Sequence, residues 1–232
     1  MKFSLIIPCY NEEKNLEILI NRCSDILKNN NCEIVLVNNG SYDNSKEILE
    51  KKNKSFTNLK VLHLQKNIGY GNGIVEGLKL ATGDILGWTH ADLQTDPSDF
   101  LQAINFFKNT DDKIYVKGLR KKRILFDLLF TFGMNIFETL LFKNVMKDIN
   151  AQPNVFTKNF FLSLDAFPND YSLDLFFYVS AKKQQLKFHR FPVFFNKRLH
   201  GSSHWNSGLK SKLKFIIRTL SYSFKLKKKY NL

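Results

Sequence analysis

The sequence predicts an α/β fold with a mostly parallel central sheet flanked by helices. Along the first half of the chain, short aliphatic runs alternate with segments of helical length, which is the βαβ pattern. A length of 232 residues with 44% hydrophobic residues also suits one globular domain with a full-sized core. Disorder is therefore not expected.

The expected elements follow in chain order. Strands are expected at 3–8, 33–39, 59–64, 84–89 and 113–118, and helices at 12–29, 69–83, 124–142 and 169–183. The segment 124–142 repeats apolar residues at the i, i+3 and i+4 spacing of a helix. In a parallel α/β sheet the carboxyl ends of the strands share one edge, and ligands bind there.

A polar loop follows each of the first four expected strands, at 8–13, 38–45, 66–73 and 89–97. Alternate residues at a strand end project to one side, so His90, Asp92 and Gln94 are expected to face one point. These loops predict a binding site at the sheet edge.

The residues of each loop could also serve the fold alone, without binding a ligand. The composition of 38–45 suits a turn with a helix cap, and His90 with Asp92 could form a strand-end hydrogen-bonded pair. The glycines of 69–73 suit a phosphate-binding loop or a flexible helix start, and they match neither the dinucleotide fingerprint nor the P-loop.

The charge of the chain favours an anionic partner. Lys and Arg outnumber Asp and Glu by 35 to 21, which gives a net charge of +14. Nucleic acid is not expected, because the basic residues cluster beside an apolar helix instead of forming a groove interleaved with aromatic residues. Three cysteines without CxxC spacing predict no disulfide framework and no zinc site, and they favour a reducing compartment.

Two segments favour a membrane surface. The basic cluster 120–123 precedes the apolar helix 124–142, and the stretch 210–229 carries eight basic residues and no acid among apolar ones. Amphipathic helices of this kind lie on a bilayer, and no window reaches the ~18 apolar residues that would span one. The alternatives are a helix packed on the core and a solvated run of charge. The apolar run within residues 1–13 is too short for the apolar core and cleavage site of a signal peptide.

Five motifs together resemble a known family: SLIIPCYNEEKNL, VLVNNGSYDNS, KNIGYGNGIVEGLKLATGD, HADLQTDP and FPVFFNKRLHGSSHW. The chain resembles the family 2 glycosyltransferases of the GT-A fold, a Rossmann-like nucleotide-sugar-binding architecture. Within them it is most similar to the branch of dolichyl-phosphate mannosyltransferases and other polyprenyl-phosphate glycosyltransferases. The resemblance implies a GT-A domain at 1–205, with a donor half at 1–118 and an acceptor half at 119–205. A basic amphipathic C-terminal tail follows at 206–232.

The resemblance implies an inverting, metal-dependent transfer of a sugar from a nucleotide sugar to a polyprenyl phosphate at the membrane. The family's metal loop is usually Asp-x-Asp, and here His90 replaces the first Asp. Asp92 is then the principal ligand of a divalent cation, with Gln94 and His90 assisting. The expected cation is Mn²⁺ or Mg²⁺, and Mn²⁺ tolerates an imidazole more readily.

The resemblance also implies a set of donor-binding residues. They are Pro8, Tyr10, Glu12, Asn39, Asn67, Gly69, His90, Ala91 and Asp92. The usual VDDGS of the second loop reads VNNGS here. Asn38 and Asn39 accept hydrogen bonds but also donate them, so uracil, guanine and cytosine remain open as the base.

For the acceptor, the resemblance aligns Arg120 with an arginine that binds lipid phosphate. The segment NKRLHGSSHW adds Arg198, Ser203 and His204, with His204 where Lys is usual. The residues expected to act in catalysis are Asp92, Asp174, Arg120 and Arg198, and Asp148 aligns with a loop near the sugar site.

The sequence leaves two classes of acceptor open, a lipid phosphate and a sugar hydroxyl. A lipid phosphate needs no general base, whereas a sugar hydroxyl would need one, for which Asp174 or Asp170 is the candidate. Their structural interpretations are an exposed first-turn acid for Asp174 and a helix cap for Asp170.

Two other functions compete with the lipid-directed enzyme. One is transfer to a hydroxyl of a cell-envelope glycan such as capsule or lipopolysaccharide, and the other is a non-catalytic nucleotide-binding relative. The expected location is cytoplasmic and peripheral on the inner face of the membrane, with or without a membrane-protein partner.

Overall fold

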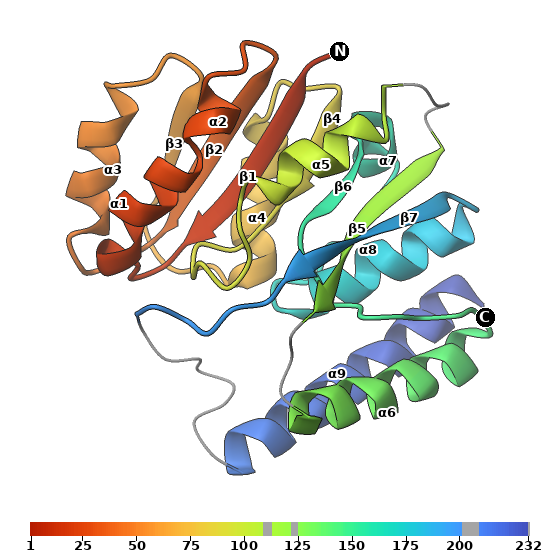
Figure 1. Ribbon diagram of the computed structural model, residues 1–232. Helices are drawn as coiled ribbons and strands as arrows, with labels where there is room; N and C mark the ends of the chain where they lie inside the picture. The colour runs from red at the N-terminus through yellow and green to blue at the C-terminus, as the bar shows by residue number, and fades with distance from the viewer. Residues whose placement is uncertain (109–112, 122–124, 201–208, 232) are drawn as a thin grey trace.

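The computed structural model describes residues 1–108, 113–121, 125–200 and 209–231. Its centre is a seven-stranded sheet with the strand order β3-β2-β1-β4-β6-β5-β7 (Figure 1). The strands are β1 (Phe3–Cys9), β2 (Cys32–Asn39), β3 (Leu59–Leu64), β4 (Ile85–Trp88), β5 (Ile114–Lys121), β6 (Asn154–Thr157) and β7 (Lys187–Phe194). Among these described strands β6 alone runs antiparallel, to both β4 and β5. The predicted mostly parallel α/β class is confirmed.

The described helices are α1 (Glu13–Arg22), α2 (Ser24–Leu27), α3 (Ser45–Asn53), α4 (Tyr70–Leu80), α5 (Asp99–Asn105), α6 (Leu125–Phe142), α7 (Lys158–Leu162), α8 (Ser172–Lys183) and α9 (Leu209–Tyr230). The helix expected at 12–29 is divided at Cys23 into α1 and α2. Strands β6 and β7 are not among the five expected strands.

Two apolar cores cover the two faces of the sheet, because side chains alternate along each strand. Leu5 and Ile7 of β1 join one core with α1, α2 and α5, whereas Ile6 of the same strand joins the other with α4 and α8. Figure 1 shows these helices on opposite sides of the strands. The centre of the sheet is therefore buried on both faces, and the polar loops extend from its edge.

Helices α6 and α9 form a pair that lies beside the sheet and its covering helices (Figure 1). The rings of Phe137 and Phe224 are 6.0 Å apart, and Ser223 Oγ donates to Glu138 Oε1 at 2.6 Å. The far end of α9 reaches α8, where the hydroxyl oxygens of Ser180 and Tyr230 are 2.6 Å apart. The described part of the predicted tail is thus a helix packed on the domain.

Both helices also keep apolar side chains in solvent. Exposed examples are Phe132, Ile136 and Leu140 on α6 and Leu213, Ile217 and Phe224 on α9. In the part of the chain that the structure describes, no helix combines the length and apolar character needed to cross a bilayer.

The three cysteines are free and buried. Burial raises the pKa of Cys32 to about 11 and that of Cys23 to about 12. These thiols are packing groups without thiolate reactivity.

Candidate functional site

The loops after β1 and β2 are joined by hydrogen bonds between backbone and short side chains. Asn11 N donates to Ser41 Oγ and Tyr42 N donates to Asn11 Oδ1, both at 3.0 Å. Asn11 has a φ of +56°, a left-handed conformation that Asn tolerates better than most residues. The loop that carries Pro8, Tyr10 and Glu12 is therefore held in one conformation, and these three side chains are half-buried.

Glu12 lies near Asp92 at this edge. Burial is the main cause of its raised pKa, and the negative charge of Asp92 raises the pKa further. Ala91 is buried between His90 and Asp92. The predicted donor residues of the first and fourth loops are thus brought together at one end of the sheet.

Asn39 supports the third loop through its amide. Its Nδ2 donates to Gly69 O at 3.0 Å, and its Oδ1 accepts from Ile68 N at 3.1 Å. Asn67 Oδ1 accepts from Gly69 N at 2.8 Å. Asn39 is 3% exposed, so it holds this loop in place, and its predicted contact with the donor base remains a prediction.

The glycines of this loop allow close packing against the segment before α8. A Cβ on Gly69 would lie 2.2 Å from Asn169 O, and one on Gly71 would lie 2.1 Å from Pro168 O. Gly71 N also donates to Asn169 O at 2.9 Å. The first turn of α4 is covered by protein backbone, which agrees with the helix-start interpretation and not with an open phosphate-binding loop.

Asp92 is the buried carboxylate of the fourth loop. It is 4% exposed, and its Oδ2 lies 2.7 Å from Nη2 of Arg198. Its Oδ1 accepts from Gln94 N at 3.1 Å, while Arg198 Nε donates to Gln94 Oε1 at 3.4 Å. The segment after β7 therefore lies over this carboxylate and places a positive group against it.

A divalent cation fits this arrangement. The Arg198 guanidinium lies beside Asp92 Oδ2, where the positive charge of a cation would lie. Gln94 Oε1 lies next to the same guanidinium. Among the described residues no cluster of three or more His, Cys, Asp or Glu side chains could hold a metal alone. A cation bound through one carboxylate together with substrate phosphates is the usual manner of Mg²⁺.

His90 contacts Tyr70 instead of Asp92. Its Nε2 lies 2.9 Å from the Tyr70 hydroxyl, and the two rings meet edge to face at 5.6 Å. Tyr70 stacks in turn on Tyr171, with ring centroids 4.6 Å apart. The prediction that His90 helps to bind the cation remains a prediction.

Asp174 is buried, so its interpretation as an exposed first-turn acid is wrong. Its Oδ2 accepts from the Tyr70 hydroxyl at 3.1 Å, and its Oδ1 accepts from Gln152 Nε2 at 2.8 Å and Asn154 Nδ2 at 3.0 Å. Burial within helix α8 explains the difference, since almost all of that helix is enclosed by the second core.

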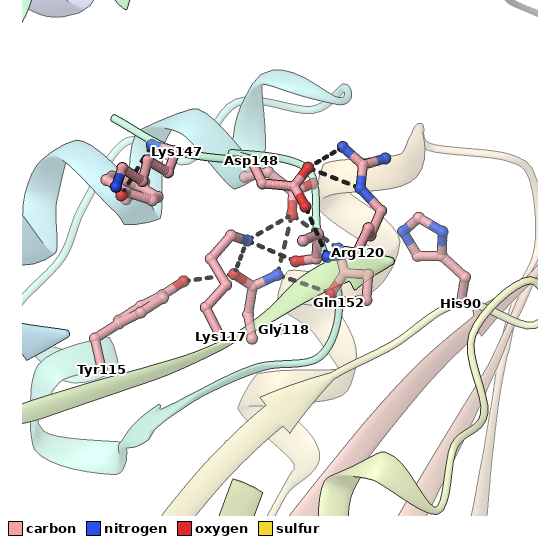
Figure 2. Close-up of polar contacts among 12 residues, drawn as sticks. His90, Tyr115, Lys117, Gly118, Arg120, Lys147, Asp148 and Gln152 are labelled. Atoms are coloured by element: carbon pink, nitrogen blue, oxygen red, sulfur yellow. Dashed lines mark hydrogen bonds and ion pairs between the residues drawn. The ribbon is translucent and has the colours of Figure 1, made fainter. Parts of the chain in front are cut away.

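Lys117 completes this cluster from β5. It is fully buried, donates to Ala151 O at 2.7 Å and to Asn154 Oδ1, and lies 3.9 Å from Asp174 Oδ1. Burial lowers its pKa to about 7. Figure 2 shows Lys117 among these amide groups, with Arg120 and Asp148 nearby.

Sequence reasoning missed Tyr70, Lys117, Gln152 and Asn154. The available signal was a lysine inside the apolar strand segment IYVKG, at a position where a central strand buries both faces.

Arg120 and Asp148 form a second arginine–aspartate pair (Figure 2). The backbone N of Arg120 donates to Asp148 Oδ2 at 2.9 Å and its Nε donates to Oδ1 at 2.8 Å. The Arg120 guanidinium also lies over the ring of Phe195 at 5.2 Å.

An open apolar groove of about 650 Å³ begins at this pair and runs along α6. It is lined by Leu119, Arg120, Thr131, Phe132, Asn135, Ile136, Thr139, Leu140, Val145, Met146, Lys147 and Asp148. The groove therefore joins an apolar trough to a charged end.

The other predicted residues fall in different places. Asp170 Oδ1 accepts from Ser172 N at 2.9 Å and its Oδ2 lies 3.1 Å from Arg218 Nε. The N-cap of α8 is Tyr171, so Asp170 lies one residue before the expected cap position. Ser203 and His204 lie outside the described residues.

This fold and this edge define a class. A sheet of order β3-β2-β1-β4-β6-β5-β7, with an acidic loop after β4, is the GT-A architecture of nucleotide-sugar-dependent glycosyltransferases. The profile of Glycosyl transferase family 2 matches residues 4–161, which is more than half of the chain. The chain belongs to this family, as its motifs predicted.

Known relatives cover part of the chain. Dolichol-phosphate mannosyltransferase of Pyrococcus furiosus is 37% identical over 122 residues, covering 51% of this chain and 34% of that protein. Undecaprenyl-phosphate 4-deoxy-4-formamido-L-arabinose transferase of Yersinia enterocolitica is 32% identical over 128 residues, covering 54% and 39%. The matches thus span between a third and two-fifths of these relatives' lengths.

A solved structure supports the fold over nearly the whole chain. Glucosyl-3-phosphoglycerate synthase from Mycobacterium tuberculosis, in complex with Mn²⁺, uridine diphosphate and glucosyl-3-phosphoglycerate, superposes with a TM-score of 0.70. The match covers 96% of this chain and 79% of that one at 15% identity. At this identity the likeness shows the fold alone.

Proposed function

We propose that this protein transfers a sugar from a nucleotide sugar to a polyprenyl phosphate at a membrane surface, with inversion and with a divalent cation. The observation that carries the proposal is the apolar groove along α6 with Arg120 at its charged end. The two curated relatives described above are named as acting on dolichol phosphate and undecaprenyl phosphate, which supports the same acceptor class.

The groove matches both parts of such an acceptor. A polyprenyl phosphate has a long apolar chain and an anionic head. Phe132, Ile136 and Leu140 offer apolar surface that would otherwise face water, at exposures of 63%, 46% and 74%. Arg120 offers a planar group that binds phosphate in a bidentate manner. The phosphate would replace the Asp148 carboxylate on the guanidinium.

The donor occupies the edge formed by the loops after β1, β2 and β4. Asp92 and Gln94 would hold the cation, whose charge would stabilise the leaving diphosphate. Arg198 would move from Asp92 onto the donor phosphates, because the cation would compete with the guanidinium for Asp92 Oδ2.

The acceptor phosphate is already ionised, so the attack needs no proton removal and proceeds as a single displacement, which inverts the anomeric carbon. Asp174 lies behind Tyr70 with both oxygens accepting hydrogen bonds. These hydrogen bonds engage Asp174, so they do not favour it as the base that would activate a hydroxyl acceptor.

Membrane attachment would use the outer faces of α6 and α9. Leu213 and Ile217 are exposed beside exposed Lys214, and Phe224 is exposed beside Lys225 and Lys228. Basic residues near an anionic leaflet each contribute about 1 kcal/mol, and the apolar residues add burial.

The test is a transfer assay with undecaprenyl phosphate in anionic vesicles and a panel of nucleotide sugars. Leu140→Asp places a charge in the groove and is expected to lower lipid-linked product at least tenfold. Leu162→Asp is the matched control, because Leu162 is 66% exposed on α7, outside the groove residues, and it is expected to keep full activity.

Two outcomes would contradict the proposal. An equal loss of lipid-linked product in both variants would show that the groove does not bind the acceptor. Absence of any turnover or hydrolysis of the nucleotide sugars would favour the non-catalytic relative.

A further inference from the structure

Lys117 and the Asp174 carboxylate together determine the direction of the hydrogen bonds around Asp174. A lysine donates to the two oxygens it contacts here, so Asn154 Oδ1 must accept. The amide of Asn154 then donates through Nδ2 to Gln152 Oε1 at 2.7 Å and to Asp174 Oδ1 at 3.0 Å. Gln152 in turn presents its Nε2 to Asp174 Oδ1.

Oδ2 of Asp174 continues the chain toward the donor edge. A carboxylate only accepts, so the Tyr70 hydroxyl uses its single proton on Asp174. The hydroxyl oxygen is left to accept, and the partner on that side is Nε2 of His90 at 2.9 Å.

We infer that Tyr70 and Asp174 are positioning residues that hold His90 as its Nε2–H tautomer, with the Nδ1 lone pair presented to the donor-bound cation. No hydrogen bond joins Nδ1 to another residue in the described part of the chain. The cation role rests on the proposed function, whereas the tautomer follows from the hydrogen bonds alone.

This arrangement is a common way to prepare a histidine ligand. A metal-binding imidazole usually donates its other N–H to a carboxylate or carbonyl, which fixes the ring and makes the ligand nitrogen more basic. Here a tyrosine hydroxyl stands between the imidazole and the carboxylate. An imidazole nitrogen suits Mn²⁺ better than Mg²⁺, so the inference also predicts Mn²⁺ as the preferred ion.

Asp174→Asn tests the inference by reversing the chain. Gln152 and Asn154 both donate to the Oδ1 position, so the new amide must keep its oxygen there and direct its NH₂ at Tyr70. The Tyr70 proton then turns to His90 Nε2, and His90 becomes the Nδ1–H tautomer. Its lone pair no longer faces the cation.

The first measurement is ¹⁵N NMR of the histidine side chains in the full chain without ligand, with His90 assigned by its loss in His90→Gln. The expected result is Nε2–H in the wild type and Nδ1–H in Asp174→Asn. Asp165→Asn is the matched control, since the exposed Asp165 pairs with Lys229 of α9, and it should leave the tautomer unchanged. The same tautomer in the wild type and Asp174→Asn would overturn the inference.

A second variant covers the case in which Asp174→Asn does not fold. Tyr70→Phe removes the bridge, so the His90 Nε2 proton is expected to exchange at least tenfold faster with water. Equal protection in Tyr70→Phe would also overturn the inference.

The second measurement is Mn²⁺ affinity by electron paramagnetic resonance in the presence of uridine diphosphate. Asp174→Asn is expected to weaken Mn²⁺ binding about 10- to 100-fold. When His90 is already replaced by Ala, adding Asp174→Asn is expected to cause no additional loss of Mn²⁺ affinity. A reversed tautomer with unchanged Mn²⁺ affinity would exclude the cation role. Absence of a lipid-linked product would count against the proposed function and would leave the tautomer result intact.

Discussion

The donor edge and the acceptor groove are built in different ways. Short polar side chains join the loops of the donor edge, as Asn11, Ser41 and Asn39 illustrate. The groove is open apolar surface on α6, connected to the sheet through Arg120 and Asp148. The donor edge is therefore cross-linked by hydrogen bonds, whereas the groove exposes apolar side chains that the proposed lipid acceptor would cover.

The two regions also share a feature. Each places an arginine on an aspartate: Arg198 on Asp92 at the donor edge and Arg120 on Asp148 at the groove. Both guanidiniums suit phosphate, and both are neutralised by a carboxylate in this structure. The difference lies in what would displace the partner, a cation with diphosphate at one site and a lipid phosphate at the other.

The largest effect is expected at Asp92. Asp92→Asn removes the charge that would hold the cation, and transfer is expected to fall about 10³-fold, equivalent to several kcal/mol of barrier. Steady-state transfer at saturating acceptor checks it. Asp96→Asn is the control in the same loop, because Asp96 Oδ1 accepts from the backbone N of Ser98, the residue before α5, and the variant should keep activity. Similar losses in both variants would mean that the loop, and not the carboxylate, matters.

A stability effect is expected on the acceptor side, at Glu138. Burial raises its pKa to about 7, and its Oε2 has no hydrogen-bond partner among the described residues. The folded state therefore retains a proton that the unfolded chain releases near pH 4.5, so Glu138 destabilises the α6–α9 pair as pH rises from about 5 through 7.

Glu138→Gln removes this dependence. We expect a gain on the order of 2 kcal/mol in unfolding free energy at pH 8 and little change at pH 5. Denaturant titration at the two pH values measures it, with exposed Glu47→Gln as the control. A gain that is equal at both pH values would show that the carboxyl is not titrating in this range.

Arg120→Lys separates the acceptor from the donor. Lysine keeps the charge and loses the bidentate fork, so the KM for undecaprenyl phosphate is expected to rise about tenfold, near 1.4 kcal/mol. The KM for the nucleotide sugar should not change. Titration of each substrate decides the outcome, and a matching rise in both KM values would contradict separate sites.

The smallest effect is expected at Arg198. Without nucleotide, Arg198→Ala should bind Mn²⁺ about threefold more tightly, because the cation no longer competes with a guanidinium that lies 2.7 Å from Asp92 Oδ2. Lys197→Ala is the neighbouring control. Weaker Mn²⁺ binding in Arg198→Ala would mean that Arg198 supports the metal site instead of blocking it.

The sequence predicted the donor edge better than the rest. Strand ends, loop composition and the motif HADLQTDP are local signals, and each of the expected strands 3–8 and 33–39 is a strand in the structure. The predicted helix at 124–142 is also observed, as α6 over the described residues Leu125–Phe142.

The groove and the Asp174 cluster depend on contacts distant in sequence. Arg120 meets Asp148 across 28 positions, and Tyr70 meets Asp174 across 104 positions. Periodicity cannot pair such residues. The alternative interpretation of Asp174 as an exposed acid is wrong because α8 is enclosed along most of its length, whereas the polar start of a helix usually faces water.

Photo-cross-linking with a polyprenyl phosphate that carries a diazirine on its chain tests the central claim most directly. Mass spectrometry after irradiation should locate the label on Phe132, Ile136 or Leu140, and Arg120→Lys or competing undecaprenyl phosphate should reduce it. Labelling elsewhere, as at Leu162, or equal labelling by a polyprenol without phosphate, would contradict an acceptor groove on α6.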